Sequence, residues 1–142
     1  MTGVQTCALP ICHEILSVRP EDSVFDAIKL MAERNVGSLL VMENNALVGI
    51  MSERDYARSV ILKGRSSANT KVKDIMSSRV ICVAPEQTVE EAMALMTDKR
   101  VRHLPVLIED EVVGVISIGD LVKNIIDGQQ FIIDQLERYI SG

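Results

Sequence analysis

The chain has 142 residues, 47% of them hydrophobic, and a formal net charge of −5. This length suits one compact domain, and the core should be aliphatic because there is no Trp and only two Phe and two Tyr. The negative charge argues against nucleic acid as a partner, since phosphate contacts need clustered Lys and Arg. No apolar run approaches the roughly 18–20 residues of a membrane span. The three cysteines match no zinc pattern, so we expect no metal site and reduced thiols in a cytoplasmic protein.

Residues 1–11 carry no charge and lack the basic start and sustained apolar core of a signal peptide. Residues 2–11 back-translate to ACT GGA GTT CAG ACG TGT GCT CTT CCG ATC, which resembles a common short-read sequencing adapter. We therefore expect 1–11 to be a non-native segment, with the authentic chain beginning near Cys12 or His13. Sequencing an independent clone tests this hypothesis, and finding the same codons in the genome would contradict it.

A strand and a helix are predicted next. Residues 13–18 form a short apolar run typical of a strand. Ser23 is a good N-cap with Asp26 at the capping-box position, so a helix with one buried face should begin at Val24. Gly37 is expected to end that helix.

A strand pair and a second helix complete the first unit. Strands are predicted at 38–42 and 47–51, on either side of the polar turn 43–46. Ser52 caps the helix that follows. The order of the unit is therefore strand, helix, strand, strand, helix. The polar residues after it have the composition of a linker.

A second unit repeats this order. Its predicted elements are a strand at 80–83, a helix from 88 to about 99, strands at 102–108 and 112–116, and a helix opened by Ser117. Pro105 lies inside one of these strands and indicates an edge or a strand start, because proline cannot donate to a ladder.

A tail follows Gly128 and has no counterpart in either unit. Ile132, Leu136, Tyr139 and Ile140 fall on one face of a helix. Two interpretations remain open. The helix could close the core of the monomer, or it could form a contact between two copies of the chain.

The two units are copies of each other. Residues 18–56 and 83–121 align without a gap and are identical at 14 of 39 positions. A Gly-x-x-Ser-x-x-Asp motif occurs in both copies, at 49–55 and 114–120. Residues 72–76 lead into the second copy, whereas the N-terminal segment discussed above occupies the corresponding place before the first. An ungapped duplication predicts two halves of one fold.

On these two motifs, the strand pairs and the duplication, the chain resembles a tandem pair of cystathionine-β-synthase-type (CBS) domains, called a Bateman module. It is similar in particular to small stand-alone bacterial CBS-pair proteins. The resemblance covers essentially all of 13–142 and implies an α/β (α+β) fold, with two pseudo-symmetric β-α-β-β-α repeats packed as one module. The expected segments are the non-native stretch 1–11, repeat one at 12–62, a linker at 63–71, repeat two at 72–128 and a C-terminal helix at 129–142.

The resemblance also implies a ligand and partners. Such modules bind adenosine-containing molecules in two clefts between the repeats. AMP, ADP or ATP is expected first, with NAD or S-adenosylmethionine as further options. No covalent cofactor or metal is expected. A homodimer and an effector protein that responds to the bound ligand are implied as partners.

Two carboxylates and two hydroxyls are the strongest candidates for ligand contacts. Asp55 and Asp120 can each accept two hydrogen bonds from ribose hydroxyls. Ser52 and Ser117 stand at helix starts, where a hydroxyl and free N–H groups suit a phosphate. The alternative is that Ser-x-x-Asp is only a capping box. Two copies, each behind a glycine and a strand pair, favour ligand clefts.

The two copies differ immediately before the aspartate. Arg54 precedes Asp55, whereas Gly119 precedes Asp120. Arg54 is a candidate phosphate contact because it is a permanent cation with fork geometry. The cleft built on Ser52 and Asp55 is therefore expected to hold its nucleotide more tightly. The alternative for Arg54 is solvated surface charge.

Four further candidates follow the first helix of each copy. The first copy has Gly37 and Ser38 where the second has Arg102 and His103. The resemblance places both pairs along the clefts, the small pair facing base and ribose and the basic pair facing phosphate. His103 could add charge below neutral pH. Surface positions are again the alternative for both basic residues.

The motif glycines, Gly49 and Gly114, complete the candidate site because glycine permits close backbone approach. No nucleophile with a base at a known offset, Walker loop or dinucleotide fingerprint is recognisable. The sequence therefore predicts a module without catalysis, and the resemblance implies that it is regulatory, senses an adenine nucleotide and signals by conformational change. The alternative function is a non-catalytic scaffold or partner-binding dimer with vestigial clefts. An enzymatic function would need turnover of the bound nucleotide.

Overall fold

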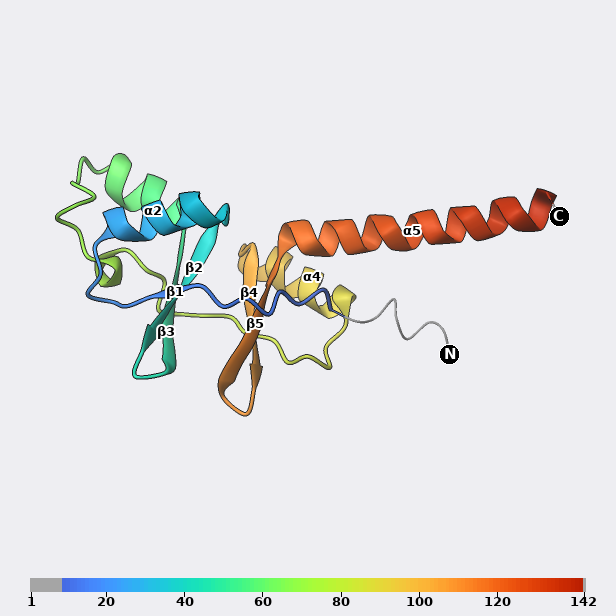
Figure 1. Cartoon of the computed structure of the whole chain (residues 1–142), viewed down its shortest axis with the longest axis horizontal. Helices are drawn as coiled ribbons and strands as arrows, with labels where there is room; N and C mark the ends of the chain where they lie inside the picture. The colour runs from blue at the N-terminus through green and yellow to red at the C-terminus, as the bar shows by residue number, and fades with distance from the viewer. Residues whose placement is uncertain (1–8, 142) are drawn as a thin grey trace. The chain divides into compact units, whose positions relative to one another are not determined.

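The computed structural model describes residues 9–141 (Figure 1). These residues form two compact units, one of residues 14–81 and the other of residues 9–13 with 82–141. The predicted non-native stretch comprises residues 1–11. Of these, residues 1–8 lie outside the described part of the chain. The segment boundaries expected from the sequence stay predictions.

The unit of residues 14–81 contains a three-stranded sheet in the order β1-β2-β3. β1 runs parallel to β2, and β2 and β3 form an antiparallel hairpin. Its elements are β1 (Ser17–Val18), α2 (Val24–Arg34), β2 (Ser38–Glu43), β3 (Ala46–Ser52), α3 (Glu53–Tyr56), the π-helical turn η1 (Ala57–Ile61) and the 3-10 turn η2 (Val72–Asp74).

The other unit repeats the helix, hairpin and helix. Its sheet has two strands in the order β4-β5, paired antiparallel. Its elements are α4 (Val89–Lys99), β4 (His103–Ile108), β5 (Glu111–Ser117) and α5 (Ile118–Ser141). The predicted mixed α/β class and the predicted order of the main elements are confirmed. None of the helices within 9–141 has the length and hydropathy of a membrane span.

Side-chain caps begin α2 and α4, as the sequence predicts. The Ser23 hydroxyl accepts the Asp26 N–H at 3.1 Å. The Thr88 hydroxyl accepts the Glu91 N–H at 3.1 Å, and the Glu91 carboxylate accepts the Thr88 N–H at 2.8 Å, which completes a capping box. α4 ends at Lys99, close to the predicted end at about residue 99.

The expectation that Gly37 ends α2 is wrong. The helix ends at Arg34, and Asn35 adopts the left-handed conformation with φ of 55°. Arg100 does the same after α4, with φ of 56°. Asparagine tolerates this region better than most residues, so glycine is not required there.

The strands predicted at 13–18 and 80–83 are shorter than expected. In the first, only β1 pairs with β2, and the Leu40 N–H donates to the Leu16 carbonyl at 3.2 Å. In the second, Val83 makes a single bridge to Val106. Pro105 occupies the place of Leu40 in the duplication and has no N–H to donate. The loss of this hydrogen bond accounts for the missing strand.

The core of unit 14–81 lies between α2 and the hairpin. The helix contributes Val24, Ala27 and Met31, and Ile28 packs half-buried against them, so the one buried face predicted for this helix is confirmed. The other buried members are Val18, Leu39, Val41, Met51, Val60, Val72 and Ile75. Because Leu39 and Met51 of the hairpin belong to this core, the packing holds in place the end of the hairpin where β3 is followed by α3.

Each hairpin receives a short segment that precedes the other copy in the sequence. Ile50 and Ser77 exchange two backbone hydrogen bonds of 3.0 and 2.9 Å. Cys12 and Val115 exchange two of 3.0 Å. Residue 12 therefore occupies in one unit the place that residue 77 occupies in the other. Leu9, just before it, is buried.

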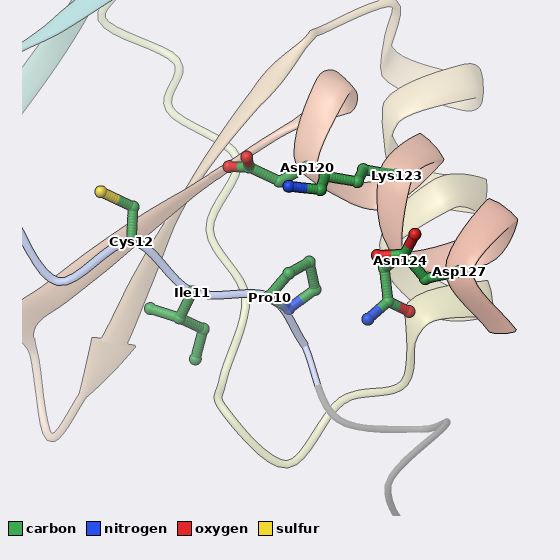
Figure 2. Close-up of a pocket in the computed structure, with 7 residues that line it drawn as sticks. All are labelled: Pro10, Ile11, Cys12, Asp120, Lys123, Asn124 and Asp127. Atoms are coloured by element: carbon green, nitrogen blue, oxygen red, sulfur yellow. The ribbon is translucent and has the colours of Figure 1, made fainter. Parts of the chain in front are cut away.

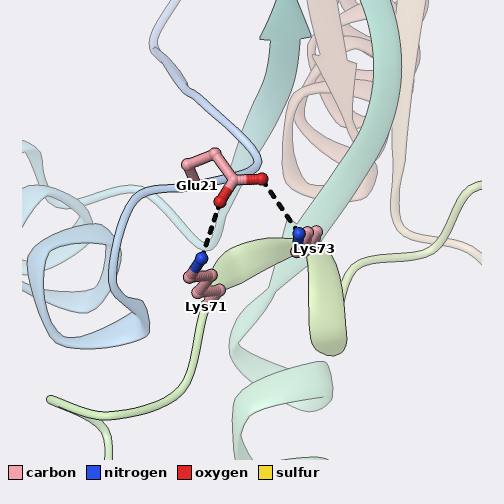
Figure 3. A network of polar contacts seen from close by, with 3 residues as sticks. All are labelled: Glu21, Lys71 and Lys73. Atoms are coloured by element: carbon pink, nitrogen blue, oxygen red, sulfur yellow. Dashed lines mark hydrogen bonds and ion pairs between the residues drawn. The ribbon is translucent and has the colours of Figure 1, made fainter.

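The chain returns from the linker onto the turn before α2 (Figure 3). The Val72 N–H donates to the Asp22 carbonyl at 2.9 Å and the Lys73 N–H to the Pro20 carbonyl at 3.0 Å. Glu21 accepts hydrogen bonds from the Lys71 amine at 2.8 Å and the Lys73 amine at 3.0 Å. The two amines, Lys71 first, hold the pKa of Glu21 below its usual value. Because all three side chains lie in solvent, the backbone bonds hold this junction.

The two described cysteines should differ in reactivity. Cys12 is exposed, whereas Cys82 is half-buried and desolvation raises the pKa of its thiol. We expect iodoacetamide at mildly alkaline pH to alkylate Cys12 before Cys82, because the thiolate is the nucleophile. Peptide mass spectrometry over time measures both rates. Equal rates, or faster labelling of Cys82, would contradict this packing.

The tail is not a separate helix. α5 runs from Ile118 to Ser141 without a break at Gly128, which the sequence had suggested as an element boundary. A Cβ built on Gly128 meets nothing within 4 Å. Glycine is permissive but does not force a bend, so the apolar periodicity on both sides carries the helix through it.

Replacing Gly128 with alanine should therefore stabilise the protein. Alanine is favoured over glycine by roughly 1 kcal/mol inside a helix, and nothing in the structure opposes the added methyl group. Urea denaturation followed by circular dichroism measures the change. Gly64→Ala is the matched control and should destabilise, because Gly64 has φ of +66°.

Candidate ligand site

Four of the predicted residues meet where β3 runs into α3. Ser38 and Ser52 are partners across the β2–β3 hairpin. The Gly37 carbonyl accepts the Glu53 N–H at 3.0 Å, so the start of α3 is tied to the start of β2. Asp55 lies in the first turn of α3. All four predicted residues are half-buried, which suits contacts with a small ligand.

Ser52 and Asp55 form a reciprocal capping box, as Ser-x-x-Asp at a helix start predicts. Ser52 Oγ accepts the Asp55 N–H at 3.2 Å, and Asp55 Oδ2 accepts the Ser52 N–H at 2.9 Å. The Ser52 hydroxyl also donates to Oδ2 at 3.1 Å. Within residues 9–141, Oδ1 of Asp55 receives no hydrogen bond. The cap therefore uses one carboxylate oxygen, and the other has no hydrogen-bond partner among the described residues.

The same arrangement recurs where β5 runs into α5. His103 and Ser117 are cross-strand partners, and the Arg102 carbonyl accepts the Ile118 N–H at 2.8 Å. Ser117 Oγ accepts the Asp120 N–H at 3.1 Å, while Asp120 Oδ2 accepts the Ser117 N–H at a longer 3.4 Å. Again the hydrogen bonds reach only one carboxylate oxygen among the described residues.

The basic candidates differ in their surroundings. Arg54 and Arg102 are exposed, and neither has an ion-pair partner in the described part of the chain. His103 is half-buried. Both arginines adjoin a Ser-x-x-Asp turn, Arg54 within it and Arg102 through its carbonyl. Their guanidinium groups are available for a phosphate, and equally for solvent.

Asp120 also lines a pocket of about 360 Å³ on α5 (Figure 2). Residues 10–12 form one wall of this pocket. Lys123, Asn124 and Asp127 form the other, together with Asp120. Sequence reasoning missed these three residues. They stand three, four and seven positions after Asp120, so helical spacing alone could have placed them on one face with it.

The motif glycines are not gathered with the other candidates. A Cβ on Gly49 would lie 2.6 Å from Met76 Sδ and 2.9 Å from the Ser77 carbonyl oxygen. A Cβ on Gly114 would lie 2.7 Å from the carbonyl oxygen of Cys12 and closer still to Ile11. The close approach that these glycines permit is therefore made by the chain's own segments.

No cluster of His, Cys, Asp or Glu in residues 9–141 could hold a metal ion. What the two sites offer is a pair of half-buried carboxylates, each beside a serine hydroxyl and a nearby cation. This chemistry suits the diol of a ribose and an anionic group next to it.

The sequence model of the CBS domain matches this chain twice, at residues 10–61 and 72–127. The chain therefore belongs to the CBS domain family and contains a tandem pair of these domains. The two matches cover the two hairpins and both Ser-x-x-Asp turns. They confirm the resemblance stated from the sequence.

A solved CBS-domain protein from Burkholderia ambifaria is 52% identical, with a TM-score of 0.80 over 82% of this chain and 86% of that chain. The mitochondrial CBS domain-containing protein CBSX3 of Arabidopsis thaliana is 46% identical over 127 residues, or 86% of this chain. The chain spans 62% of the length of that relative. The bacterial neighbour is a small protein made of a CBS pair and little else.

One more distant structure is the CBS domain pair of protein MJ0100, solved in complex with 5′-methylthioadenosine and S-adenosyl-L-methionine. It has a TM-score of 0.74 over 80% of this chain and 93% of that chain, at 20% identity. This similarity shows the shared fold alone.

Proposed function

We propose that this CBS pair is a regulatory module that binds an adenine nucleotide and signals to a partner protein by conformational change. The observation that carries this proposal is the state of Asp55 and Asp120. Each carboxylate is held by a serine cap through one oxygen, and the other receives no hydrogen bond within the described residues. A rigid carboxylate with a free oxygen is suited to the two hydroxyls of a ribose.

The residues around each aspartate complete the proposed contacts. In unit 14–81, Ser38 and Ser52 flank the ribose and the Arg54 guanidinium pairs with a phosphate. In the other unit, Arg102 and His103 provide the phosphate contacts. Arg54 stands next to its aspartate in the chain, so the site of Asp55 is proposed to bind the nucleotide more tightly. Gly49 and Gly114 are left out, because the chain itself fills the space beside them.

The ligand is proposed to be AMP, ADP or ATP, with NAD and S-adenosylmethionine as the other adenosyl molecules to test. The module is proposed to act without catalysis, in the cytoplasm and as a homodimer. A bound ligand shifts the protein between two arrangements only by its difference in affinity for them. The effector protein is therefore proposed to bind the arrangement that the nucleotide favours.

Asp55→Ala should weaken nucleotide binding by about 10- to 100-fold, since a lost charge-assisted hydrogen bond is worth roughly 1.5–3 kcal/mol. Isothermal titration calorimetry with AMP, ATP and NAD measures it, alongside Asp120→Ala. Asp26→Ala is the matched control, because Asp26 has the same position after the Ser23 cap but lies outside both motifs. Equal loss in Asp26→Ala, or none in either motif variant, would contradict the proposal.

The capping boxes favour a second candidate, a scaffold whose clefts no longer bind ligand, because a cap alone can account for each aspartate. Partner capture by the Asp55→Ala/Asp120→Ala double variant separates the two functions. Partner binding that ignores both substitutions and added AMP would support the scaffold. Loss of ATP during long incubation with the protein would instead indicate an enzyme.

A further inference from the structure

The linker predicted at 63–71 is held by hydrogen bonds to the first turn of α2, although most of its residues are exposed. The Val24 N–H donates to the Thr70 carbonyl at 2.8 Å. The Phe25 N–H donates to the Ser67 carbonyl at 3.0 Å. The start of a helix leaves four N–H groups without an intrahelical partner, and the linker satisfies two of them in α2. The linker and the start of α2 are therefore joined.

Tyr56 links this segment to the short helix that carries Asp55. Its hydroxyl lies 2.9 Å from Ser67 Oγ, and the two groups form a hydrogen bond. The Tyr56 side chain is partly buried and packs against the core of its unit. The equivalent residue of the duplication is Leu121, which is fully buried and has no hydroxyl. This hydrogen bond therefore distinguishes the Asp55 site from the Asp120 site.

A π-helical turn follows Tyr56 directly. In η1 the Leu62 N–H donates to the Ala57 carbonyl, five residues earlier, at 3.0 Å. The corresponding residues 122–126 of the other repeat belong to the regular helix α5. A π turn differs from an α turn by one residue in hydrogen-bond register, and such turns are frequent at functional sites. The same position of the repeat thus accommodates two discrete registers.

We propose that a ligand bound at Asp55 strengthens the attachment of the linker to the start of α2, and that Tyr56 is the positioning residue through which it acts. This inference rests on the proposed function and adds a regulatory output to the Asp55 site. Tyr56 acts on the linker and not on the ligand. The other repeat has no hydroxyl at this position, so the output belongs to the Asp55 site alone.

The short length of α3 explains how the two places are coupled. This helix is a single turn of four residues, so Asp55 and its neighbour Tyr56 move together. Coupling needs an element with two discrete arrangements, and the π turn after Tyr56 is such an element. The ligand favours the arrangement in which the Tyr56 hydroxyl bonds Ser67, by its higher affinity for that arrangement.

Amide hydrogen exchange of the full chain, followed by NMR, tests the contact without ligand. Tyr56→Phe removes only the hydroxyl and should speed exchange of the Val24 and Phe25 amides about 2- to 10-fold, as expected for one lost hydrogen bond. Ser67→Ala should have the same effect. Ser66→Ala is the matched control, because Ser66 is the exposed neighbour and takes no part in the Tyr56 contact.

The same amides test the coupling when AMP is added. Saturating AMP should slow their exchange at least about fivefold in the wild type, the lower end of usual coupling between sites, and should leave it unchanged in Tyr56→Phe. The dissociation constant of AMP should agree within about twofold in the two proteins, because the detached linker is a minor state in both. The Leu40 amide in the hairpin is the internal reference, since a general loosening of the unit would speed its exchange too.

The possible failures of this inference and of the proposed function are distinguishable. If AMP binds but the Val24 and Phe25 amides respond alike in the wild type and Tyr56→Phe, the coupling through Tyr56 is overturned and the proposed function stands. Exchange in Ser67→Ala that matches Ser66→Ala would likewise overturn the role of the hydroxyl contact. If neither AMP nor another adenosyl ligand binds the wild type, the proposed function fails and this inference fails with it.

Discussion

Replacing Leu39 with alanine should lower the free energy of unfolding by about 2–5 kcal/mol. Leu39 lies in β2 with 1% of its surface exposed and belongs to the core between α2 and the hairpin. Truncation would leave a cavity beside β2. The strands cannot move to fill it, because backbone pairing of β2 with both β1 and β3 fixes their positions. The expected decrease in the free energy of unfolding is the sum of two terms, the lost burial of the side chain and the cost of the cavity.

Leu104→Ala should have an effect of similar size, since Leu104 is the equivalent residue of the duplication and is fully buried in β4. Ile108→Ala is the matched control, being near the end of the same strand and 48% exposed. Urea denaturation followed by circular dichroism measures all three. If Leu39→Ala and Ile108→Ala cost the same, the core described for unit 14–81 is misplaced.

Replacing Gly49 or Gly114 with alanine should destabilise the protein by about 1–3 kcal/mol each. The new methyl group would stand 2.9 Å from the Ser77 carbonyl oxygen in the first case and 2.7 Å from that of Cys12 in the second. These are backbone atoms that exchange hydrogen bonds with the hairpin, so they cannot move away without breaking the bridge. Gly119→Ala is the control, because its Cβ meets only Ser117 Oγ at 3.8 Å.

The Gly114 variant also tests the role of residues 9–12. The penalty arises from the segment seated beside Gly114, so it should disappear in a chain that begins at His13. The penalty of Gly49→Ala should persist there, because Met76 and Ser77 remain. A double-mutant cycle of thermal denaturation measures the coupling. Unchanged destabilisation by Gly114→Ala in the shortened chain would show that the cause lies elsewhere.

The duplication made most of the fold predictable from the sequence. Thr88 and the apolar spacing after it predict α4 well, with its cap at Thr88 and its end near residue 99, because a cap and a buried face agree there. The predictions that are wrong each depend on a single local signal. Gly37 predicts the end of α2, but Asn35 adopts the left-handed conformation and ends the helix earlier. Gly128 suggested a boundary, although the apolar periodicity of α5 continues across it.

The missing strand at 80–83 shows how an effect at a distance escapes sequence reasoning. The local apolar run predicts a strand, but a strand also needs a partner that donates hydrogen bonds. Pro105, more than twenty residues later, removes one of them, and only the pairing of Val83 with Val106 reveals that the two segments are neighbours.

Part of the candidate site could be predicted from the sequence. The Ser-x-x-Asp turns and their neighbours at 37–38 and 102–103 come together because cross-strand pairing joins them. The glycines of the motif instead make room for other segments of the chain, residues 76–77 beside Gly49 and residues 11–12 beside Gly114. No local sequence pattern connects these segments to the glycines. The turn itself has two roles, because one oxygen of each aspartate caps a helix and the other is free among the described residues.

The most direct test of the central claim is an NMR titration of the ¹⁵N-labelled protein with AMP, followed by ATP, NAD and S-adenosylmethionine. Nucleotide sensing at these sites predicts saturable shifts of the amide signals of Ser52, Asp55, Ser117 and Asp120, with the first pair responding at lower concentration. Those amides belong to the capping boxes, so they report directly on the aspartate carboxylates. If all four ligands leave these signals unmoved, or move only signals elsewhere, the Ser-x-x-Asp turns are caps and do not bind the nucleotide.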